Sequence, residues 1–352
     1  MILRFGNLIY KVKRKLTMPP FVSIIVPCYN EEATILQLLE AVLAQTYPHS
    51  QMEIIIADAF SQDKTRERIN LFLRDHNDFS LRVVDNERRV IPAALNLAIE
   101  AARGEIIIRL DAHSQPNREY VERCVQALEE GKGSNVGGVW EIRPGGIGWV
   151  AESIAVAASH PLGVGDAMYR LNPKAGAVDT VPFGAFRREL IDQIGGFDET
   201  LLTNEDYEFN TRVRQSGSVV WLDPQIRSIY FARSSFQELA RQYWRYGFWK
   251  WRMLKRYTNT VRWRQALPPL FVASLIALIF LSFWFSFARW LLSLEIILYL
   301  FILIAASVRV ALRDHKPFLI AGLPLSILIM HLAWGSGFLF SLISSPLIQN
   351  HG

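Results

Sequence analysis

Acidic side chains follow three predicted strands of the chain, at the point where each strand ends. Glu31 lies just beyond the first of these strands, Asp58 ends the second, and Asp111 follows the third. In an open α/β sheet, ligands bind beyond the carboxyl ends of the strands. One acidic strand end is usually a turn or a helix N-cap, but three of them together favour a shared binding site. The three strands are predicted at residues 21–27, 52–58 and 105–110.

Asp111 and His113 are two positions apart, so an extended backbone points both side chains to one side. A carboxylate and an imidazole that converge in this way can hold a divalent cation, Mg²⁺ or Mn²⁺, against a diphosphate. The cation would neutralise charge that develops on a leaving nucleotide. In the other interpretation His113 only caps the turn that follows, and this short pattern leaves both interpretations open.

Two common nucleotide-binding patterns are absent from the sequence. A dinucleotide-binding fold would place Gly-x-Gly-x-x-Gly after the first strand, but residues 27–32 contain no glycine, and no P-loop sequence occurs. The formal net charge of +5 suggests an anionic partner such as a phosphate or an acidic lipid surface. Since no nucleic-acid-binding motif accompanies the charge, nucleic acid is not an expected partner. The sequence therefore argues against hydride-transfer and Walker-type enzymes.

Short β-rich runs alternate with helical patterns between residues 21 and 234, which predicts βαβ units. The expected fold is α/β, a Rossmann-like domain with a mostly parallel sheet and helices on both faces. Beyond residue 135 the pattern loosens, with a helix expected at 206–215 and a short strand at 219–222. The other predicted elements are a strand at 81–85 and helices that begin near 65 or span 34–44, 91–101 and 118–130.

Both ends of the chain favour contact with a membrane. Residues 1–20 carry a basic amphipathic pattern, which is either a helix lying on anionic lipid or a simple basic tail. Residues 235–265 combine Trp and Tyr with Lys and Arg, a composition typical of interfacial helices at the lipid headgroups. Residues 266–345 predict about three transmembrane helices, because each apolar segment is long enough to span about 30 Å of hydrocarbon. These segments are 266–287, 290–308 and 318–343.

Basic residues between the apolar segments set the expected orientation. The first connection is very short and carries Arg289, and the second carries Arg309, Arg313 and Lys316. Cytoplasmic loops of membrane proteins have an excess of positive charge. We therefore expect a multi-pass protein of the cytoplasmic (inner) membrane, whose N-terminal domain faces the cytoplasm and whose C-terminus lies outside.

Three stretches of the chain resemble the family 2 glycosyltransferases, which have the GT-A fold. Ser-Ile-Ile-Val-Pro-Cys-Tyr-Asn-Glu, which ends at Glu31, is similar to the opening strand and turn of that family. Asp-Ala-Phe-Ser-Gln-Asp-Lys-Thr, which begins at Asp58, resembles the family's D-D-G-S-x-D-x-T, with Ala59 and Phe60 as departures. A later strand leads into Asp-Ala-His, where His113 replaces the second Asp of the metal-binding D-x-D.

The second half of the domain extends the resemblance. Its motifs are Phe-Gly-Ala-Phe-Arg-Arg from Phe183, Ile-Gly-Gly-Phe-Asp-Glu from Ile194, and Asn-Glu-Asp-Tyr-Glu from Asn204. The Asp-Ala-His and Asn-x-Asp-Tyr-Glu forms, together with the apolar C-terminal region, are most similar to the ExoA-like succinoglycan-biosynthesis glucosyltransferases. The resemblance covers residues 21–231, with the motifs in the order that the family has.

The resemblance implies an inverting sugar transfer. Asp206 would be the general base that takes the proton from the acceptor hydroxyl, although a carboxylate at a helix start is also a common stabiliser of the helix dipole. Asp111 and His113 would hold Mg²⁺ or Mn²⁺ on the donor diphosphate. The residues that would bind the donor nucleotide are Pro27, Tyr29, Glu31, Asp58 and Asp111.

Four further residues are candidates for contact with the acceptor or the diphosphate. Gln242 and Arg245 lie in Gln-Tyr-Trp-Arg-Tyr, which resembles the Q-x-x-R-W of processive synthases but ends in Tyr246. The same stretch is equally consistent with an interfacial helix. Glu205 precedes the expected base, and Trp140 is either an acceptor-site aromatic or an indole of the core.

The implied reaction moves a hexose from a nucleotide-diphosphate sugar, UDP-glucose-like, to a polyprenyl-linked saccharide in exopolysaccharide or related glycan synthesis. Three spans are few for a translocation pore, which disfavours a polymer synthase. Two alternatives stay open, namely direct transfer to polyprenyl phosphate and a catalytically inactive nucleotide-sugar-binding module on a membrane anchor. The intact Asp111 and Asp206 argue against the inactive module.

Overall fold

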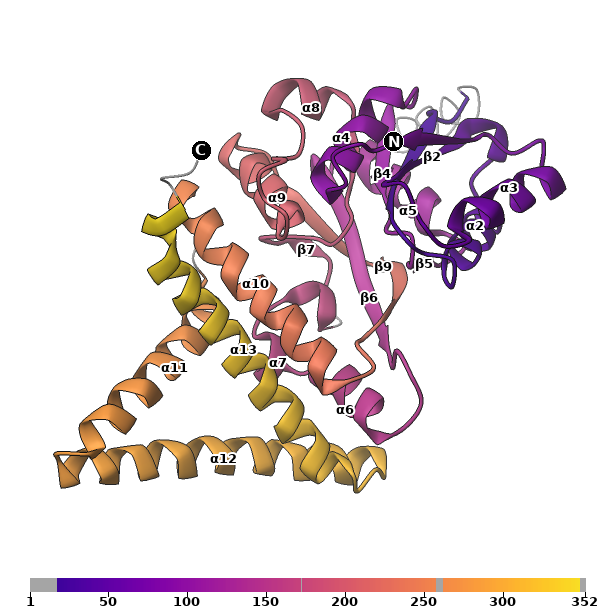
Figure 1. The fold of residues 1–352 in the computed structure, drawn as a ribbon. Coiled ribbons are helices and arrows are strands. Elements are labelled where there is room, and N and C mark those ends of the chain that lie inside the picture. The colour runs from indigo at the N-terminus through magenta and orange to yellow at the C-terminus, as the bar shows by residue number, and fades with distance from the viewer. Residues whose placement is uncertain (1–17, 172, 258–261, 349–352) are drawn as a thin grey trace, which may run out of the picture.

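A nine-stranded mixed sheet forms the centre of the N-terminal domain in the computed structural model, which describes residues 18–171, 173–257 and 262–348 (Figure 1). The strand order is β3-β2-β1-β4-β8-β6-β9-β5, and β7 pairs with β9. The basic amphipathic pattern predicted at the N-terminus falls almost wholly on residues 1–17, outside the described residues. The strands are β1 (Val22–Cys28), β2 (Met52–Asp58), β3 (Leu81–Asp85), β4 (Ile106–Arg109), β5 (Gln115–Pro116), β6 (Asn135–Arg143), β7 (Gly176–Ala177), β8 (Ala185–Arg187) and β9 (Val220–Phe231).

The first four strands are parallel, and β1, β2 and β4 are buried on both faces while the edge strand β3 is partly exposed. β1 pairs in parallel with β2 and with β4, and β2 pairs in parallel with β3. Continuous apolar runs such as Ile-Ile-Ile in β2 and β4 suit this position, because helices cover a parallel sheet on both sides. The predicted α/β class is confirmed. The domain helices are α2 (Ile35–Leu43), α3 (Thr65–Asp75), α4 (Ile91–Ala101), α5 (Tyr120–Glu129), α6 (Trp149–Ala157), α7 (Pro161–Val164), α8 (Glu189–Ile194) and α9 (Glu205–Gln215), with short 3₁₀ turns η1 (His49–Gln51) and η2 (Met168–Arg170).

Beyond β4 the sheet is mixed, and its longest strand differs from the prediction. The short strand expected at 219–222 is the start of β9, which continues to Phe231. β9 pairs in parallel with β6, with Gly137 opposite Leu222 and Val139 opposite Arg227, so four residues of β9 bulge out between the two pairings. Pro224 lies in this bulge, where its missing N–H is tolerated. Pairing then resumes, which is why the strand is longer than its apolar run.

Three helices in the described part of the chain are long and apolar enough to cross a membrane, as predicted. The predicted connections between them are wrong, because most of the basic residues expected there lie in a helix. Arg289 lies inside the second helix, and Arg309 and Arg313 lie in its last two turns, so only Lys316 belongs to a connection. Arg is a good helix former, and these three continue the helix rather than end it. The helices are α11 (Trp263–Ser282), α12 (Ser286–Asp314) and α13 (Leu319–Ile348).

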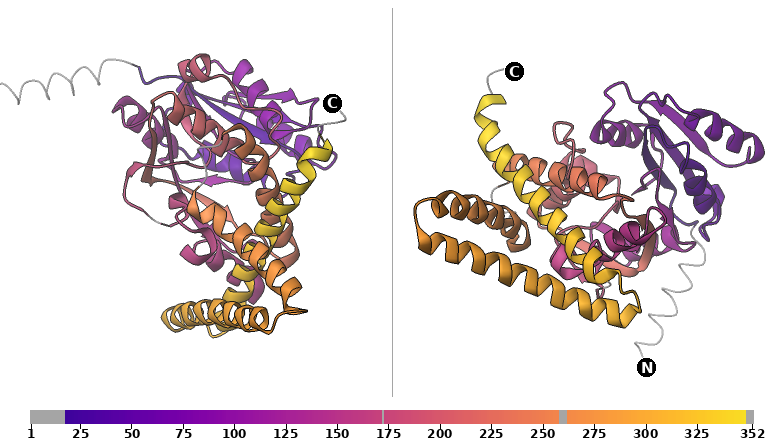
Figure 2. Two further views of the ribbon diagram at one scale, coloured as in Figure 1. Left: turned by 90° about the vertical axis from the view of Figure 1, so that its left-hand side faces the viewer. Right: turned by 60° about the horizontal axis from the view of Figure 1, so that its bottom comes forward.

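The last helix joins the apolar region to the domain. α10 (Phe236–Arg256) lies along α13 in both Figures 1 and 2, while α11 and α12 extend away from the domain. Glycines permit the close approach of α10 and α13, because a Cβ at Gly247 would overlap the carbonyl of Trp334 and one at Gly337 would overlap that of Trp244. Small residues serve helix contacts in membrane proteins in the same way.

This packing predicts a measurable penalty for a single added methyl group. Gly337→Ala should lower the melting temperature of the protein in detergent, because overpacking by about 1–3 kcal/mol outweighs the better helix propensity of Ala. Gly176→Ala is the matched control, since a Cβ there meets no atom within 4 Å. A variant at Gly337 as stable as the control would show that α10 and α13 are not held at this distance.

Candidate active site

A single buried arginine lies at the centre of three of the carboxylates that the sequence singled out. Arg109 ends β4, and its side chain is 2% exposed. Its guanidinium donates to Asp111 at 3.1 Å, to Glu205 at 2.9 Å and to Asp206. β4 supplies Arg109, the loop after β4 supplies Asp111, and the first turn of α9 supplies the other two carboxylates. Residues 109 and 206, 97 positions apart, thus meet at the carboxyl end of the sheet.

The electrostatics of this cluster act most strongly on Asp206. Its side chain is 28% exposed and lines a cavity, so a substrate can reach it. Burial, together with the nearby charges of Glu205 and Asp111, raises the pKa of Asp206, and Arg109 opposes the shift. A carboxyl group with a raised pKa is a stronger base than an ordinary one, which suits proton abstraction. Asn204, which precedes α9 in a left-handed conformation (φ 69°), turns the chain so that the helix starts at this point.

The residues of the predicted metal site fit a divalent cation. Three carboxylates face one guanidinium in the Arg109 cluster, which leaves an excess of negative charge beside His113. The Nδ1 atom of His113 lies 2.9 Å from Glu31, an arrangement that orients metal-binding histidines, and Nε2 makes no hydrogen bond with any described residue. Within residues 18–171, 173–257 and 262–348, no group of three or more acidic, His or Cys side chains could enclose a metal. A cation here would therefore take its remaining ligands from a substrate or water.

A cavity of about 880 Å³ connects these carboxylates with the apolar helices. Its walls come from β4, β6, β9, α9 and α10 on the domain side, and from α11, α12 and α13 on the other. The predicted residues that line it are Asp111, His113, Trp140, Glu205, Asp206, Gln242 and Arg245. The structure thus brings the expected base, the metal candidates and the acceptor candidates to one space.

The other predicted donor residues lie outside this cavity. Pro27, Tyr29 and Glu31 are at the end of β1 and in the turn that follows it, and Tyr29 is exposed. Asp58 is fully buried, where it accepts from the Ser61 backbone N–H and from Nε of Arg66 at 2.5 Å. These bonds hold the turn after β2, so a direct contact of Asp58 with the donor stays a prediction.

Aromatic side chains form part of the cavity wall. Trp140 of β6 stacks on Tyr230 of β9, with ring centroids 4.2 Å apart and an interplanar angle of 6°. Gln242 of α10 donates to the hydroxyls of Tyr230 and Tyr246, each at 3.1 Å. The Gln-Tyr-Trp-Arg-Tyr stretch is therefore part of a helix that also closes the cavity, and Trp140 is a half-buried wall residue.

Two further residues of the cavity, Arg109 and Arg170, were not predicted from the sequence. Arg109 follows Ile-Ile-Ile in β4, and one charge at the end of a strand buried on both faces is a signal that needs a counter-charge. Arg170 lies in a stretch without periodicity or motif, and no sequence signal marks it.

Comparisons with known proteins find relatives of this chain among glycosyltransferases. Residues 23–195 match the model of Glycosyl transferase family 2. The "Dolichyl N-acetyl-alpha-D-glucosaminyl phosphate 3-beta-D-2,3-diacetamido-2,3-dideoxy-beta-D-glucuronosyltransferase" of Methanococcus voltae is 29% identical to this chain, and the match covers 92% of the chain and 97% of that relative. The "Succinoglycan biosynthesis protein ExoA" of Rhizobium meliloti (strain 1021) is 27% identical, with 90% and 93% covered.

A solved structure shows the same fold. The mannosyltransferase PcManGT from Pyrobaculum calidifontis, in complex with GDP-Man and Mn²⁺, superposes with a TM-score of 0.59 at 23% identity, over 94% of this chain and 95% of that one. This likeness confirms the GT-A class expected from the motifs. Residues 23–195 therefore form a glycosyl transferase family 2 domain, and the chain is a glycosyltransferase.

Proposed function

We propose that this glycosyltransferase moves a hexose from a nucleotide-diphosphate sugar, UDP-glucose-like, to a lipid-linked saccharide in exopolysaccharide or related glycan synthesis. The cavity carries this proposal, because one continuous space joins the Arg109 carboxylate cluster to the apolar helices. A hydrophilic acceptor alone would not require apolar walls from α11, α12 and α13. An acceptor with a sugar at one end and a lipid chain at the other matches both ends of the cavity.

Asp206 is the base in the proposed reaction. Its carboxylate takes the proton of the acceptor hydroxyl, the hydroxyl oxygen forms a bond to the anomeric carbon, and the bond from that carbon to the diphosphate breaks with its electron pair on the leaving oxygen. Attack from the side opposite the diphosphate inverts the configuration. No acid is needed, since a nucleotide diphosphate leaves as an anion. Arg109 keeps Asp206 in place through its hydrogen bond.

Asp111 and His113 are the residues that would hold Mg²⁺ or Mn²⁺. The bound cation would supply charge neutralisation for the diphosphate. Glu31 would orient the imidazole of His113 through the 2.9 Å contact. Pro27, Tyr29 and Asp58, at the ends of β1 and β2, are proposed for the nucleotide side of the donor.

Two relatives support the choice of acceptor. The name of the Methanococcus voltae enzyme describes transfer to a dolichyl-linked sugar phosphate, and that of the Rhizobium meliloti protein describes succinoglycan biosynthesis. We further propose a multi-pass protein of the inner membrane with the 21–234 domain in the cytoplasm. Residues 235–265 would lie at the headgroups and 266–345 would span the bilayer.

Replacement of the base tests the reaction. Asp206→Asn should lower transfer by about 10²–10⁴-fold, because a general base contributes about that much. Membranes carrying the protein would be incubated with a panel of nucleotide sugars and with either a polyprenyl-diphosphate saccharide or polyprenyl phosphate. Release of nucleotide diphosphate is measured.

The matched control is Asp192→Asn, an exposed carboxylate on α8 that should change nothing. Undiminished transfer by Asp206→Asn would show that Asp206 is not the general base. Transfer only to polyprenyl phosphate would replace the saccharide acceptor in the proposal.

The pH profile gives a separate test of Asp206. A base must be deprotonated, so activity should fall as the pH drops through the raised pKa of this carboxyl. Glu205→Gln removes one of the charges that raise that pKa and should shift the acidic limb of kcat to lower pH. An acidic limb that stays in place would assign it to a group other than Asp206.

The metal assignment predicts a weaker site without the imidazole. His113→Ala should raise the Mn²⁺ concentration for half-maximal binding by at least about tenfold, measured by electron paramagnetic resonance with UDP present. His49→Ala, at an exposed histidine of η1, is the control. Equal Mn²⁺ affinities of the two variants would remove His113 from the site.

A further inference from the structure

Arg170 is a buried cation for which the described part of the chain provides no anion. Arg170 is 9% exposed, and its guanidinium makes no hydrogen bond or ion pair with any described residue. Instead it lies over three aromatic rings, 4.8 Å from the centroid of Trp140 and 5.4 Å from those of Tyr169 and Tyr230. Such a cage stabilises the charge by cation–π attraction and leaves the N–H donors available.

The other buried arginines of this region are compensated by carboxylates. Arg109 has Asp111, Glu205 and Asp206, and Arg264 of α11 pairs with Asp166 and Asp179. A buried charge without a counter-ion is costly, so positions of this kind are usually paired or bind a charged ligand. Arg170 is therefore built differently from a structural ion pair.

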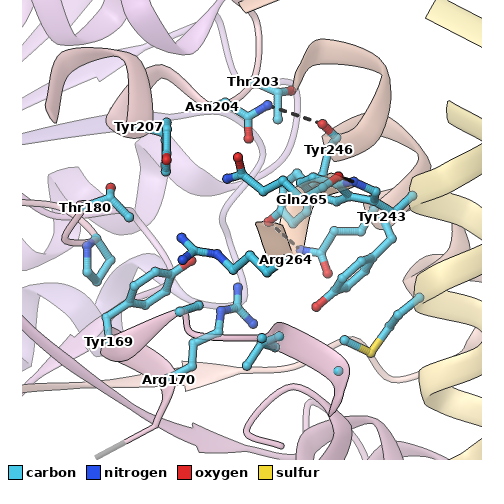
Figure 3. Close-up of a pocket in the computed structure, with 18 of the residues that line it drawn as sticks. Tyr169, Arg170, Thr180, Thr203, Asn204, Tyr207, Tyr243, Tyr246, Arg264 and Gln265 are labelled. Atoms are coloured by element: carbon cyan, nitrogen blue, oxygen red, sulfur yellow. Dashed lines mark hydrogen bonds between the residues drawn. The ribbon is translucent and has the colours of Figure 1, made fainter. Parts of the chain in front are cut away.

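The place of Arg170 in the cavity indicates which anion it meets. Figure 3 shows the side chains of Arg170 and Arg264 pointing into the same space, with the ring of Tyr169 beside them. η2, which ends at Arg170, packs on β6, two strands beyond β4 in the sheet order and on the far side of it from β1 and β2. The donor residues proposed at the ends of β1 and β2 are thus on the opposite side of the catalytic cluster.

The same cavity becomes apolar toward the helices. Leu267 and Phe271 of α11 and Met330 and Trp334 of α13 line it together with Arg170. An occupant that satisfies both features has an anionic group bonded directly to a long apolar chain. Free nucleotides and free sugars lack the chain, and neutral lipids lack the anion.

We propose that Arg170 and its aromatic cage bind the phosphate group of a prenyl phosphate or diphosphate, the part of the lipid acceptor next to its hydrocarbon chain. This inference rests on the proposed function and names the part of the acceptor that this subsite holds. Guanidinium donors match phosphate oxygens in geometry and charge. With the phosphate held at Arg170, the saccharide would extend from the phosphate toward Asp206, which lines the same cavity.

Binding of a short lipid phosphate tests the subsite without catalysis. The full chain in nanodiscs would be titrated with farnesyl diphosphate, and with farnesol as the phosphate-free probe. Arg170→Gln should weaken farnesyl diphosphate binding by at least about tenfold, which is the lower limit expected when a charge-assisted hydrogen bond is lost. Arg170→Lys should lose less, because it keeps the charge.

A matched control is available in the same protein. Arg252 also lies over two aromatic rings, 4.5 Å from the centroid of Phe248 and 5.1 Å from that of Trp249, but it does not line the cavity. Arg252→Gln should leave farnesyl diphosphate binding unchanged. UDP binding is measured in parallel as a control for folding. It should be unchanged in all variants.

Three results would overturn the assignment. Equal loss in the variants at 170 and 252 would reduce Arg170 to a packing role, and unchanged binding at 170 would place the phosphate elsewhere. If Arg170→Gln lost UDP affinity while farnesyl diphosphate binding stayed intact, Arg170 would be a residue of the donor site. Failure of the proposed function is distinguishable, since it would appear as absent transfer to lipid acceptors while the binding results stand.

Discussion

The balance of charge around Arg109 is the constraint on which the rest of the active site depends. A guanidinium this deeply buried destabilises the fold unless carboxylates surround it, and three carboxylates this close repel one another unless a cation separates them. The guanidinium and the three carboxylates therefore stabilise one another in this buried position. The pairing fixes the N-terminal end of α9 to the carboxyl end of β4, so the position of Asp206 is set by the central strand of the sheet and not by a mobile loop. Burial and the negative charges of Glu205 and Asp111 raise the pKa of the proposed base, and Arg109 opposes that shift.

Much of the first half of the fold could be predicted from the sequence, because its elements are short, periodic and bounded by polar turns. β2, β3 and α4 occur at the predicted residues. In the second half, α9 was predicted at 206–215, but the length of β9 was not. β9 continues past Pro224 only by pairing with β6, and pairing between distant segments leaves no local pattern. The predicted connections between the apolar helices were wrong for a related reason. Arg289 was assigned to a turn, although a helix surface accepts an arginine equally well.

The site shows the same division between local pattern and long-range contact. Asp111, His113 and Asp206 were found because motifs mark them, and they line one cavity. Asp58 belongs to a motif too, yet its oxygens are occupied by Ser61 and Arg66 in the turn that it stabilises. Arg170 belongs to no motif, and only its surroundings in the structure mark it as a candidate binding residue. A motif therefore shows which residues matter, while the structure is needed to say whether a carboxylate faces a ligand or holds a turn.

The apolar helices supply part of the wall of the cavity that contains Asp206. Arg264, in the first turn of α11, forms a buried ion pair with Asp179 of the domain, and the glycines of α10 and α13 bring their backbones into contact. Both interactions require defined positions, the first because a broken buried ion pair leaves an unpaired charge and the second because close packing permits little shift. The separation between Asp206 and the apolar helices is consequently fixed by the fold. A lipid-linked acceptor that enters between α11 and α13 would then present its sugar at one depth, so the length between phosphate and reacting hydroxyl becomes a determinant of which acceptor is used.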